Sequence, residues 1–184
     1  PKNSYRWAIK IAAPADERRF VWGDLYFAQS LADALESLGQ TVAIDFLGAH
    51  DRSTGYLDDI NLDIRGLTPF NPKEGKINLL WVISHPDDVT PRMVQSFQKV
   101  YSAGKPWAEY ISNLSGKSVD LLPQCTDTTI FHPDSIDKEF KDKVLFVGSS
   151  RNIARPIVID SINAGIDLSV YGGGWESLID MKYL

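Results

Sequence analysis

Hydrophobic positions in the first fifty residues follow two different periods. Apolar runs at 6–14 (RWAIKIAAP) and 41–48 (TVAIDFLG) predict buried strands, because a strand covered on both faces need not alternate. Between them, 24–39 (DLYFAQSLADALESLG) has apolar residues three and four positions apart, which predicts a helix. Its apolar face consists of Ala28, Leu31, Leu35 and Leu38. Asp24 suits the N-cap and Gly39 the position after the C-cap. The resulting βαβ unit implies a parallel sheet.

The middle of the chain predicts further strands and helices. Residues 59–67 (DINLDIRGL) alternate apolar and polar positions, which predicts a half-exposed strand near a sheet edge. Residues 77–84 (INLLWVIS) are apolar on both faces and predict a central strand. The segments that follow predict a helix at 90–104 with Thr90 as N-cap, a strand at 105–112 and a short helix or strand at 118–125.

The last third of the chain predicts a second, smaller βαβ unit. The charged stretch before it lacks apolar periodicity and predicts a linker, which we place at 136–143. The second unit comprises a strand at 143–149, a helix at 156–165 and a strand at 166–172. Two strands and one helix bury too little surface to form a core alone. The unit therefore either extends the first sheet or belongs to a second domain that continues beyond these residues.

We therefore predict an α/β protein with a Rossmann-like parallel sheet and flanking helices. The expected division is a Rossmann-like amino-terminal domain at 1–135, the linker, and the start of a second domain at 144–184.

Composition and charge exclude several classes of function. The net charge of −5 argues against a surface-wide nucleic-acid footprint, which requires excess positive charge. No apolar run approaches the ~20 residues that span a bilayer, and Cys125, the single cysteine, excludes an intrachain disulfide. We expect a cytoplasmic protein that needs no cofactor. Because the sequence begins at Pro1 rather than at Met, we expect it to be a partial or processed chain. The three histidines lack metal-ligand spacing, so no metal site is expected.

The segment 144–156 (VLFVGSSRNIARP) suggests an anion site. A strand ends at Gly148, two serines and Arg151 follow, and a helix begins next to Arg155. The first amides of a helix lack intrahelical partners, and guanidinium groups bind phosphate through two parallel hydrogen bonds. The segment matches neither the P-loop nor the dinucleotide-binding pattern. The alternative is an ordinary loop whose arginines pair with surface carboxylates.

A glycine-rich segment, 171–177 (YGGGWES), follows the next strand. Its residues would border a ligand beside the first loop, and the tryptophan would stack on it or form a wall of the pocket. The alternative is a flexible turn with a core tryptophan. The residues concerned are Gly172, Gly173, Gly174 and Trp175.

At these residues the chain resembles a known family. The stretch 144–175 resembles the start of the nucleotide-sugar-binding domain of GT-B-fold glycosyltransferases, in particular the spore-maturation-type (CgeB-like) branch of the group 1 glycosyl transferases. The stretches 77–89 (INLLWVISHPDDV) and 121–134 (LLPQCTDTTIFHPD) resemble the amino-terminal domain of the same proteins. The likeness extends from about Trp7 to Trp175, and no single motif in it is diagnostic.

The resemblance implies a bacterial enzyme of polysaccharide biosynthesis that transfers a sugar from a nucleotide-diphosphate donor to a glycan or glycoconjugate. In that fold two Rossmann-like domains face a cleft, with the acceptor held by the first. Acceptor loops would lie around 13–24 and 85–88. The acidic motif that binds ribose and sugar lies beyond Leu184, so we expect most of the donor domain to lie outside this chain. The donor diphosphate would contact Gly148, Ser149, Arg151 and Arg155, and the nucleotide would contact Gly172, Gly173, Gly174 and Trp175.

Candidate catalytic groups follow the strand at 77–84. His85, Asp87 and Asp88 should face the cleft, where a base would deprotonate the acceptor hydroxyl. The alternative for His85 is a hydrogen-bonded residue at a strand end. Rival carboxylates in the first loop are Asp16, Glu17 and Asp24. Two other functions remain open, namely a non-catalytic GT-B-like domain that binds a partner protein or glycan, and a flavodoxin-like or receiver-type regulator.

Overall fold

The computed structural model describes residues 4–133 and 144–184. The chain divides into two compact units, Pro1–Asp127 and Thr128–Leu184. The linker predicted at 136–143 lies outside the described residues.

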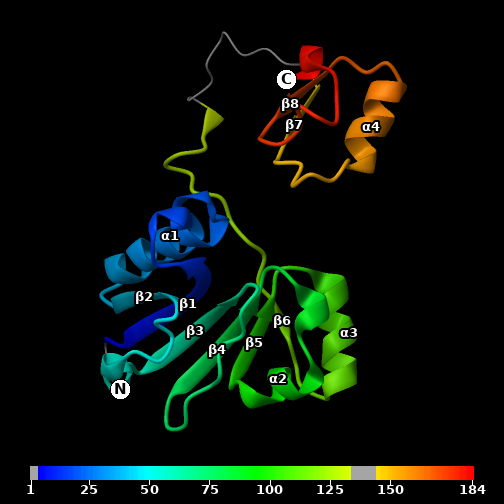
Figure 1. The fold of residues 1–184 in the computed structure, drawn as a ribbon. Coiled ribbons are helices and arrows are strands. Elements are labelled where there is room, and N and C mark those ends of the chain that lie inside the picture. The colour runs from blue at the N-terminus through cyan, green and yellow to red at the C-terminus, as the bar shows by residue number, and fades with distance from the viewer. Residues whose placement is uncertain (1–3, 134–143) are drawn as a thin grey trace. The chain divides into compact units, whose positions relative to one another are not determined.

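The first unit is built on a parallel sheet with six strands in the order β2-β1-β3-β4-β5-β6 (Figure 1). The strands are β1 (Arg6–Pro14), β2 (Thr41–Leu47), β3 (Ile60–Arg65), β4 (Ile77–Val82), β5 (Lys99–Ser102) and β6 (Asp120–Leu121). The helices are η1 (Glu17–Val21), α1 (Gly23–Ser37), η2 (Ser53–Leu57), η3 (Pro86–Asp88), α2 (Pro91–Ser96) and α3 (Lys105–Ser115). The predicted α/β class with a Rossmann-like parallel sheet and flanking helices is confirmed.

The first βαβ unit forms as predicted, except at the start of its helix. Gly39 follows the C-cap of α1 with φ +78°, a backbone conformation that favours glycine. Asp24 is not the N-cap. That position is taken by Trp22, and Asp24 is the second residue of the helix.

The predicted half-exposed edge strand is instead a fully buried central strand. β3 lies between β1 and β4, and all six of its residues are buried. Its polar side chains face other parts of the protein rather than water. The alternation of apolar and polar residues correctly predicted a strand. It could not show that other parts of the protein cover the polar side of this strand.

The predictions for 90–112 were wrong in their boundaries and in one element type. The helix after Thr90 ends at Ser96, and Lys99–Ser102 form strand β5. The predicted strand at 105–112 is helix α3, whose buried residues Ala108 and Ile111 are three positions apart. β6 forms only two residues of the segment at 118–125.

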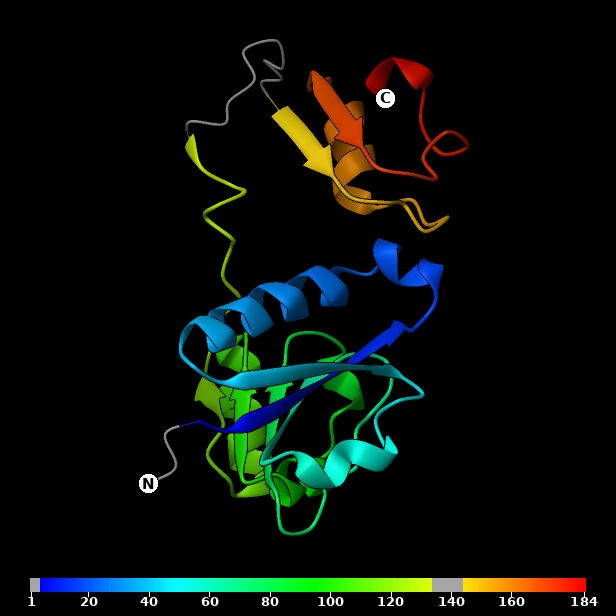
Figure 2. The same ribbon diagram turned by 90° about the vertical axis from the view of Figure 1, so that its left-hand side faces the viewer.

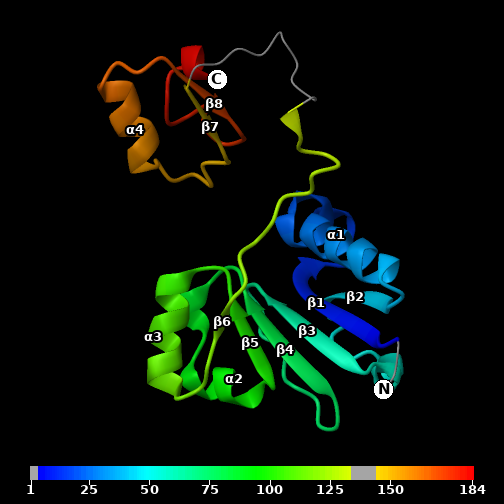
Figure 3. The same ribbon diagram turned by 180° about the vertical axis from the view of Figure 1, so that it is seen from behind.

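Two apolar clusters cover opposite faces of the sheet, since alternate side chains of a strand point to opposite sides. On one face, α1 packs through Ala28 and Ala32 against a cluster that includes Trp81 of β4. On the other face, α2 and α3 pack against a cluster that includes Leu80 and Val82 of β4. Figures 1 and 3 show α2 and α3 beside β4, β5 and β6. Figure 2 shows α1 and η2 on opposite sides of β1 and β2.

The second unit contains two parallel strands and a helix. β7 (Val144–Val147) pairs with β8 (Leu168–Tyr171), and α4 (Pro156–Asn163) connects them. A short helix, η5 (Met181–Tyr183), follows. The buried cluster consists of Val158, Leu168, Val170 and Trp175. The strand, helix and strand predicted for this segment are thus present in the structure.

Candidate functional site

The order of the strands reverses at β1 and defines a ligand position at the carboxyl edge of the sheet. The chain runs from β1 outward to β2 and then returns to β3 on the other side of β1. The first five strands have the order 2-1-3-4-5, which is that of flavodoxin-like doubly wound sheets. In open α/β sheets, ligands bind outside the carboxyl ends of the strands at such a switch point. The loops that follow β1 and β3 form this edge.

Glycine at position 66 lets the two strand ends come together. A Cβ atom at Gly66 would lie 2.7 Å from Cβ of Ala12 and 3.2 Å from Oδ2 of Asp24. A larger residue would therefore push β3 away from β1 and displace the Asp24 side chain. The Asp24 carboxylate therefore lies next to Gly66, at the switch point.

The environment of Asp24 favours the protonated form of its carboxyl group. Partial burial is the main cause that raises the pKa of Asp24, while backbone hydrogen bonds from Asp24 and Ala12 and the nearby His85 lower it. Asp24 lies in the first turn of α1 and His85 in the loop after β4, so the fold brings near each other two groups that are 61 positions apart. A carboxyl group with a raised pKa beside an imidazole can exchange protons with a bound ligand.

The predicted catalytic residues follow β4 at this edge of the sheet. His85 caps η3 in the left-handed conformation, with φ +49°. Its Nδ1 atom lies 3.0 Å from Oγ of Ser84, which in turn donates to the carbonyl of Arg65. Asp87 and Asp88 follow within η3 and are exposed. His85 is also close enough to Asp24 for its charge to lower the pKa of that carboxyl group.

The rival carboxylates in the first loop differ from Asp24. Asp16 caps η1 and accepts hydrogen bonds from the Arg18 guanidinium, which lowers the pKa of Asp16 to about 2. A carboxylate that acidic remains ionised at neutral pH and is a poor proton acceptor. Glu17 is exposed within η1. Asp24 is therefore the stronger candidate base of the three.

A row of buried titratable side chains crosses the sheet face opposite to α1. Asp45 of β2, Lys10 of β1 and Asp63 of β3 lie in register on three adjacent strands. Each is 3% exposed or less. Nζ of Lys10 lies 2.5 Å from Oδ2 of Asp45 and donates to the carbonyl of His50 at 3.0 Å. A buried charge requires such partners because burial disfavours the ionised form.

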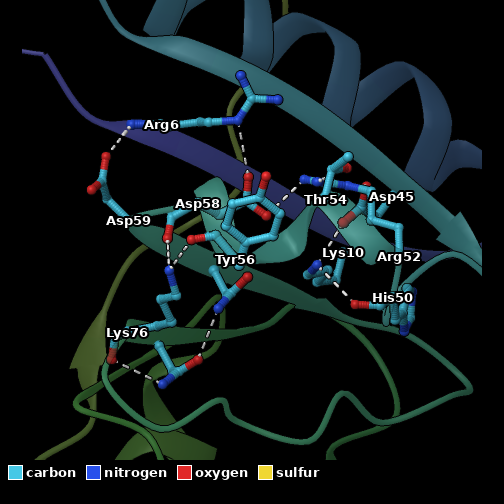
Figure 4. Close-up of polar contacts among 12 residues, drawn as sticks. Arg6, Lys10, Asp45, His50, Arg52, Thr54, Tyr56, Asp58, Asp59 and Lys76 are labelled. Atoms are coloured by element: carbon cyan, nitrogen blue, oxygen red, sulfur yellow. Dashed lines mark hydrogen bonds and ion pairs between the residues drawn. The ribbon is translucent and has the colours of Figure 1, made fainter.

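Arginine side chains extend this row into a network (Figure 4). Arg52 donates through Nε to Asp45 at 2.7 Å and through Nη2 to Asp58 at 2.7 Å. Arg6 donates through Nε to the other oxygen of Asp58 at 3.2 Å. The network joins the loop after β2 and the segment before β3 to the sheet. Together with the short helix η2, the network covers this part of the sheet face.

Asp63 and Arg65 complete the charged face. Burial raises the pKa of Asp63 to about 7, although an amide hydrogen bond from Phe70 and the charges of Arg65 and Lys10 lower it. The Arg65 side chain is 2% exposed, and its Nη1 donates to the carbonyl of Gly66. Nε of Arg65 is buried without a hydrogen-bond partner. Such groups are rare in native proteins.

In the second unit, the loops predicted to bind the donor bond to each other. The amide of Gly148 donates to the carbonyl of Tyr171 at 2.7 Å, and the amide of Ser150 donates to the carbonyl of Gly173 at 3.0 Å. Two amides in the predicted diphosphate loop therefore already have partners. Ser149 and Arg151 are exposed.

Arg155 is the predicted donor-site residue whose side chain remains partly unsatisfied. Its Nη2 donates to the carbonyl of Ser149 at 3.2 Å, while Nε is buried without a partner.

Close backbone contact explains the glycines in these loops. A Cβ at Gly172 would lie 2.5 Å from the carbonyl carbon and oxygen of Gly148, and one at Gly174 would lie 2.8 Å from Oγ of Ser150. Gly173 has open space at the Cβ position. Trp175, expected at the nucleotide, is fully buried and donates from Nε1 to the carbonyl of Gly148 at 2.7 Å. The structure shows the alternative, a core tryptophan.

The fold thus defines a Rossmann-like α/β protein with a smaller βαβ unit. No protein-family model and no curated protein matches the chain. None of the helices in residues 4–133 and 144–184 has the length and apolar character that crossing a bilayer requires. Within the same residues, no three His, Cys, Asp or Glu side chains are grouped to hold a metal ion.

The sequence interpretation missed the charged face completely. Its residues come from three strands and the connection between β2 and β3, and none has a motif spacing that would group them. One signal was present in the sequence. A lysine in the middle of the apolar run 6–14 is unusual, because lysine is almost never fully buried unless it is paired. The residues missed include Lys10, Asp45, Arg52, Asp63 and Arg65.

Proposed function

We propose that the chain takes part in the transfer of a sugar from a nucleotide-diphosphate donor to a glycan or glycoconjugate acceptor. The observation that carries this proposal is the half-buried Asp24 carboxylate next to Gly66, close enough to His85 for its charge to lower the pKa of Asp24, at the edge where an α/β sheet binds its ligand. The resemblance in the sequence supplies the class of reaction. In this proposal the first unit contributes to the acceptor side and the loops of the second unit contribute to the donor side.

The proposed chemistry needs two contributions from the protein. Asp24 or His85 accepts the proton of the acceptor hydroxyl, and the freed oxygen forms the new bond to the anomeric carbon. The bond between that carbon and the diphosphate oxygen breaks, and its electron pair leaves on the diphosphate. Arg151 and Arg155 would stabilise the charge that develops there.

Calorimetric titration with UDP, GDP and ADP tests the donor side. We expect saturable binding of at least one nucleotide, and Arg151→Ala should weaken it about 10- to 150-fold, which corresponds to the loss of one charged hydrogen bond of ~1.5–3 kcal/mol. Arg92 is an exposed arginine on α2, and Arg92→Ala is the matched control. Affinity that is equal in the parent and Arg151→Ala would remove that residue from the site.

One observation favours the second function, a non-catalytic GT-B-like domain that binds a partner protein or glycan. The amides of Gly148 and Ser150 are already hydrogen-bonded within the unit, which leaves fewer donors for a diphosphate. If none of the three nucleotides binds, glycan-array binding of the chain tests the second function. A glycan signal that is lost in Asp24→Asn would place the glycan at the switch point.

A further inference from the structure

The sheet face opposite to α1 contains a cavity over β1 and β3. Two segments without an α-helix cover this region, residues 48–59 with the short helix η2 and residues 66–76. The cavity has a volume of about 240 Å³ and is lined by parts of both segments and by the strands below them. Sites for drug-sized ligands measure about 300–1,000 Å³, so this cavity matches a smaller molecule.

Three lysines reach this cavity from different parts of the fold. Lys10 lies on the sheet and is 2% exposed, whereas Lys73 and Lys76 come from the segment before β4. Nζ of Lys73 lies 2.5 Å from Oδ1 of Asp51, and Nζ of Lys76 donates to the carbonyls of Tyr56 and Asp58 at 2.7 and 2.6 Å. An ammonium group has three N–H donors. Each lysine therefore keeps at least one donor beyond these bonds.

Asp51 pairs with Lys73, but the other two lysines have no carboxylate of their own. Asp58 accepts from both Arg6 and Arg52, and Asp45 is shared between Lys10 and Arg52. Lys76 bonds to backbone carbonyls rather than to a carboxylate. The cavity is thus lined by four cationic side chains and one carboxylate, that of Asp51, although the chain as a whole carries −5. A local excess of one charge in a concave site attracts ligands of the opposite charge.

We propose that this cavity binds a small phosphate-bearing anion, of the size of inorganic phosphate, pyrophosphate or a short phosphorylated metabolite. Lysine binds phosphate as a point charge, and three ammonium groups around one space match the oxygens of a tetrahedral group. Arg52 lines the same space, but two carboxylates already hold its guanidinium. Asn61 adds an amide to the lining from β3. None of these residues takes part in the proposed sugar transfer.

Titration with inorganic phosphate and with pyrophosphate at constant ionic strength tests the proposal. We expect saturable binding by calorimetry, weakened at least tenfold in the double variant Lys73→Gln/Lys76→Gln. The matched control is Lys105→Gln/Lys182→Gln, which removes the same charge elsewhere and should bind like the parent chain. Lys10→Met is less suitable, because it leaves Asp45 buried with one partner fewer and endangers folding. The thermal midpoint of each variant shows whether the fold is retained.

Two results would overturn the inference. One is the absence of saturable binding of both probes to the parent chain, and the other is equal weakening in the control double variant, which would indicate a general charge effect. Arg151→Ala separates this site from the proposed donor site. Phosphate affinity should be unchanged in Arg151→Ala, while the affinity for nucleoside diphosphates falls. The inference therefore holds or fails independently of the proposed function.

Discussion

At the scale of single residues, glycine and buried charge determine the candidate sites. Gly66 allows the ends of β1 and β3 to approach each other, and Gly172 allows the two loops of the second unit to pack together. Of the glycines in 171–177, Gly172 lies against the protein's own backbone at Gly148, Gly174 lies against the Ser150 side chain, and Gly173 has open space. A glycine in the sequence shows where another group can approach the backbone closely. It does not show whether that group belongs to a ligand or to the protein itself.

The contact at Gly172 gives a matched pair of substitutions. Gly172 has φ +140° and no space for Cβ, so Gly172→Ala should destabilise the second unit by about 2–4 kcal/mol through strain and overpacking. Gly173 has open space, and Gly173→Ala should change stability by less than about 1 kcal/mol. Hydrogen exchange at the amides of β7 and β8 measures the effect. Equal protection in the two variants would contradict the packing described.

At the scale of elements, length and local pattern predicted the longest segments best. β1, α1, β2 and β4 were correctly assigned, because each has at least six residues with a clear apolar pattern. The region 90–112 contains a six-residue helix, a four-residue strand and a helix with three buried residues. A short element has too few residues to show whether its apolar positions repeat every 2 residues, as in a strand, or every 3.6 residues, as in a helix. Packing in the core beside β4 decided which of these segments became a helix and which a strand.

Two substitutions in helix α3 test which face of this helix packs against the sheet. Ile111 is 1% exposed in the core cluster, so Ile111→Ala should reduce the free energy of unfolding by about 2–5 kcal/mol. Leu114 on the same helix is 56% exposed, and Leu114→Ala should change it by less than about 0.5 kcal/mol. Urea unfolding monitored by circular dichroism measures both. A larger loss for Leu114→Ala would mean that this helix presents a different face to the sheet.

At the scale of the whole molecule, the order of strands determines which polar residues become buried. The alternation in 59–67 predicted an exposed polar face, which would hold for an edge strand. Because β3 instead lies between β1 and β4 under a covering loop, Asp63 and Arg65 are removed from water. Burial then changes the titration of Asp63 and gives stability a dependence on pH.

Asp63→Asn tests that dependence. The pKa of Asp63 is about 7 in the folded chain and about 3.8 when unfolded, so the folded state holds a proton that the unfolded state has released. The contribution of Asp63 to the free energy of unfolding therefore falls as pH rises from about 4 to about 7 and is constant above. In urea unfolding, the advantage of the variant over the parent in free energy of unfolding should increase by about 2–3 kcal/mol from pH 5 to pH 8. A relative loss at pH 8 would show that Asp63 is ionised and paired with Arg65.

The sequence by itself determined the α/β class, the first βαβ unit and the second strand-helix-strand unit. These depend on hydrophobic periodicity, which is a property of neighbouring positions. It also placed His85 near a strand end, where the structure has it, and proposed Asp24 as a base. Only the tertiary structure decided that Asp24 and His85 lie near each other, that β3 is central, and that Lys10, Asp45 and Asp63 form one buried row. Such contacts depend on strand order and register, which join residues far apart in the chain, and local pattern carries no information about them.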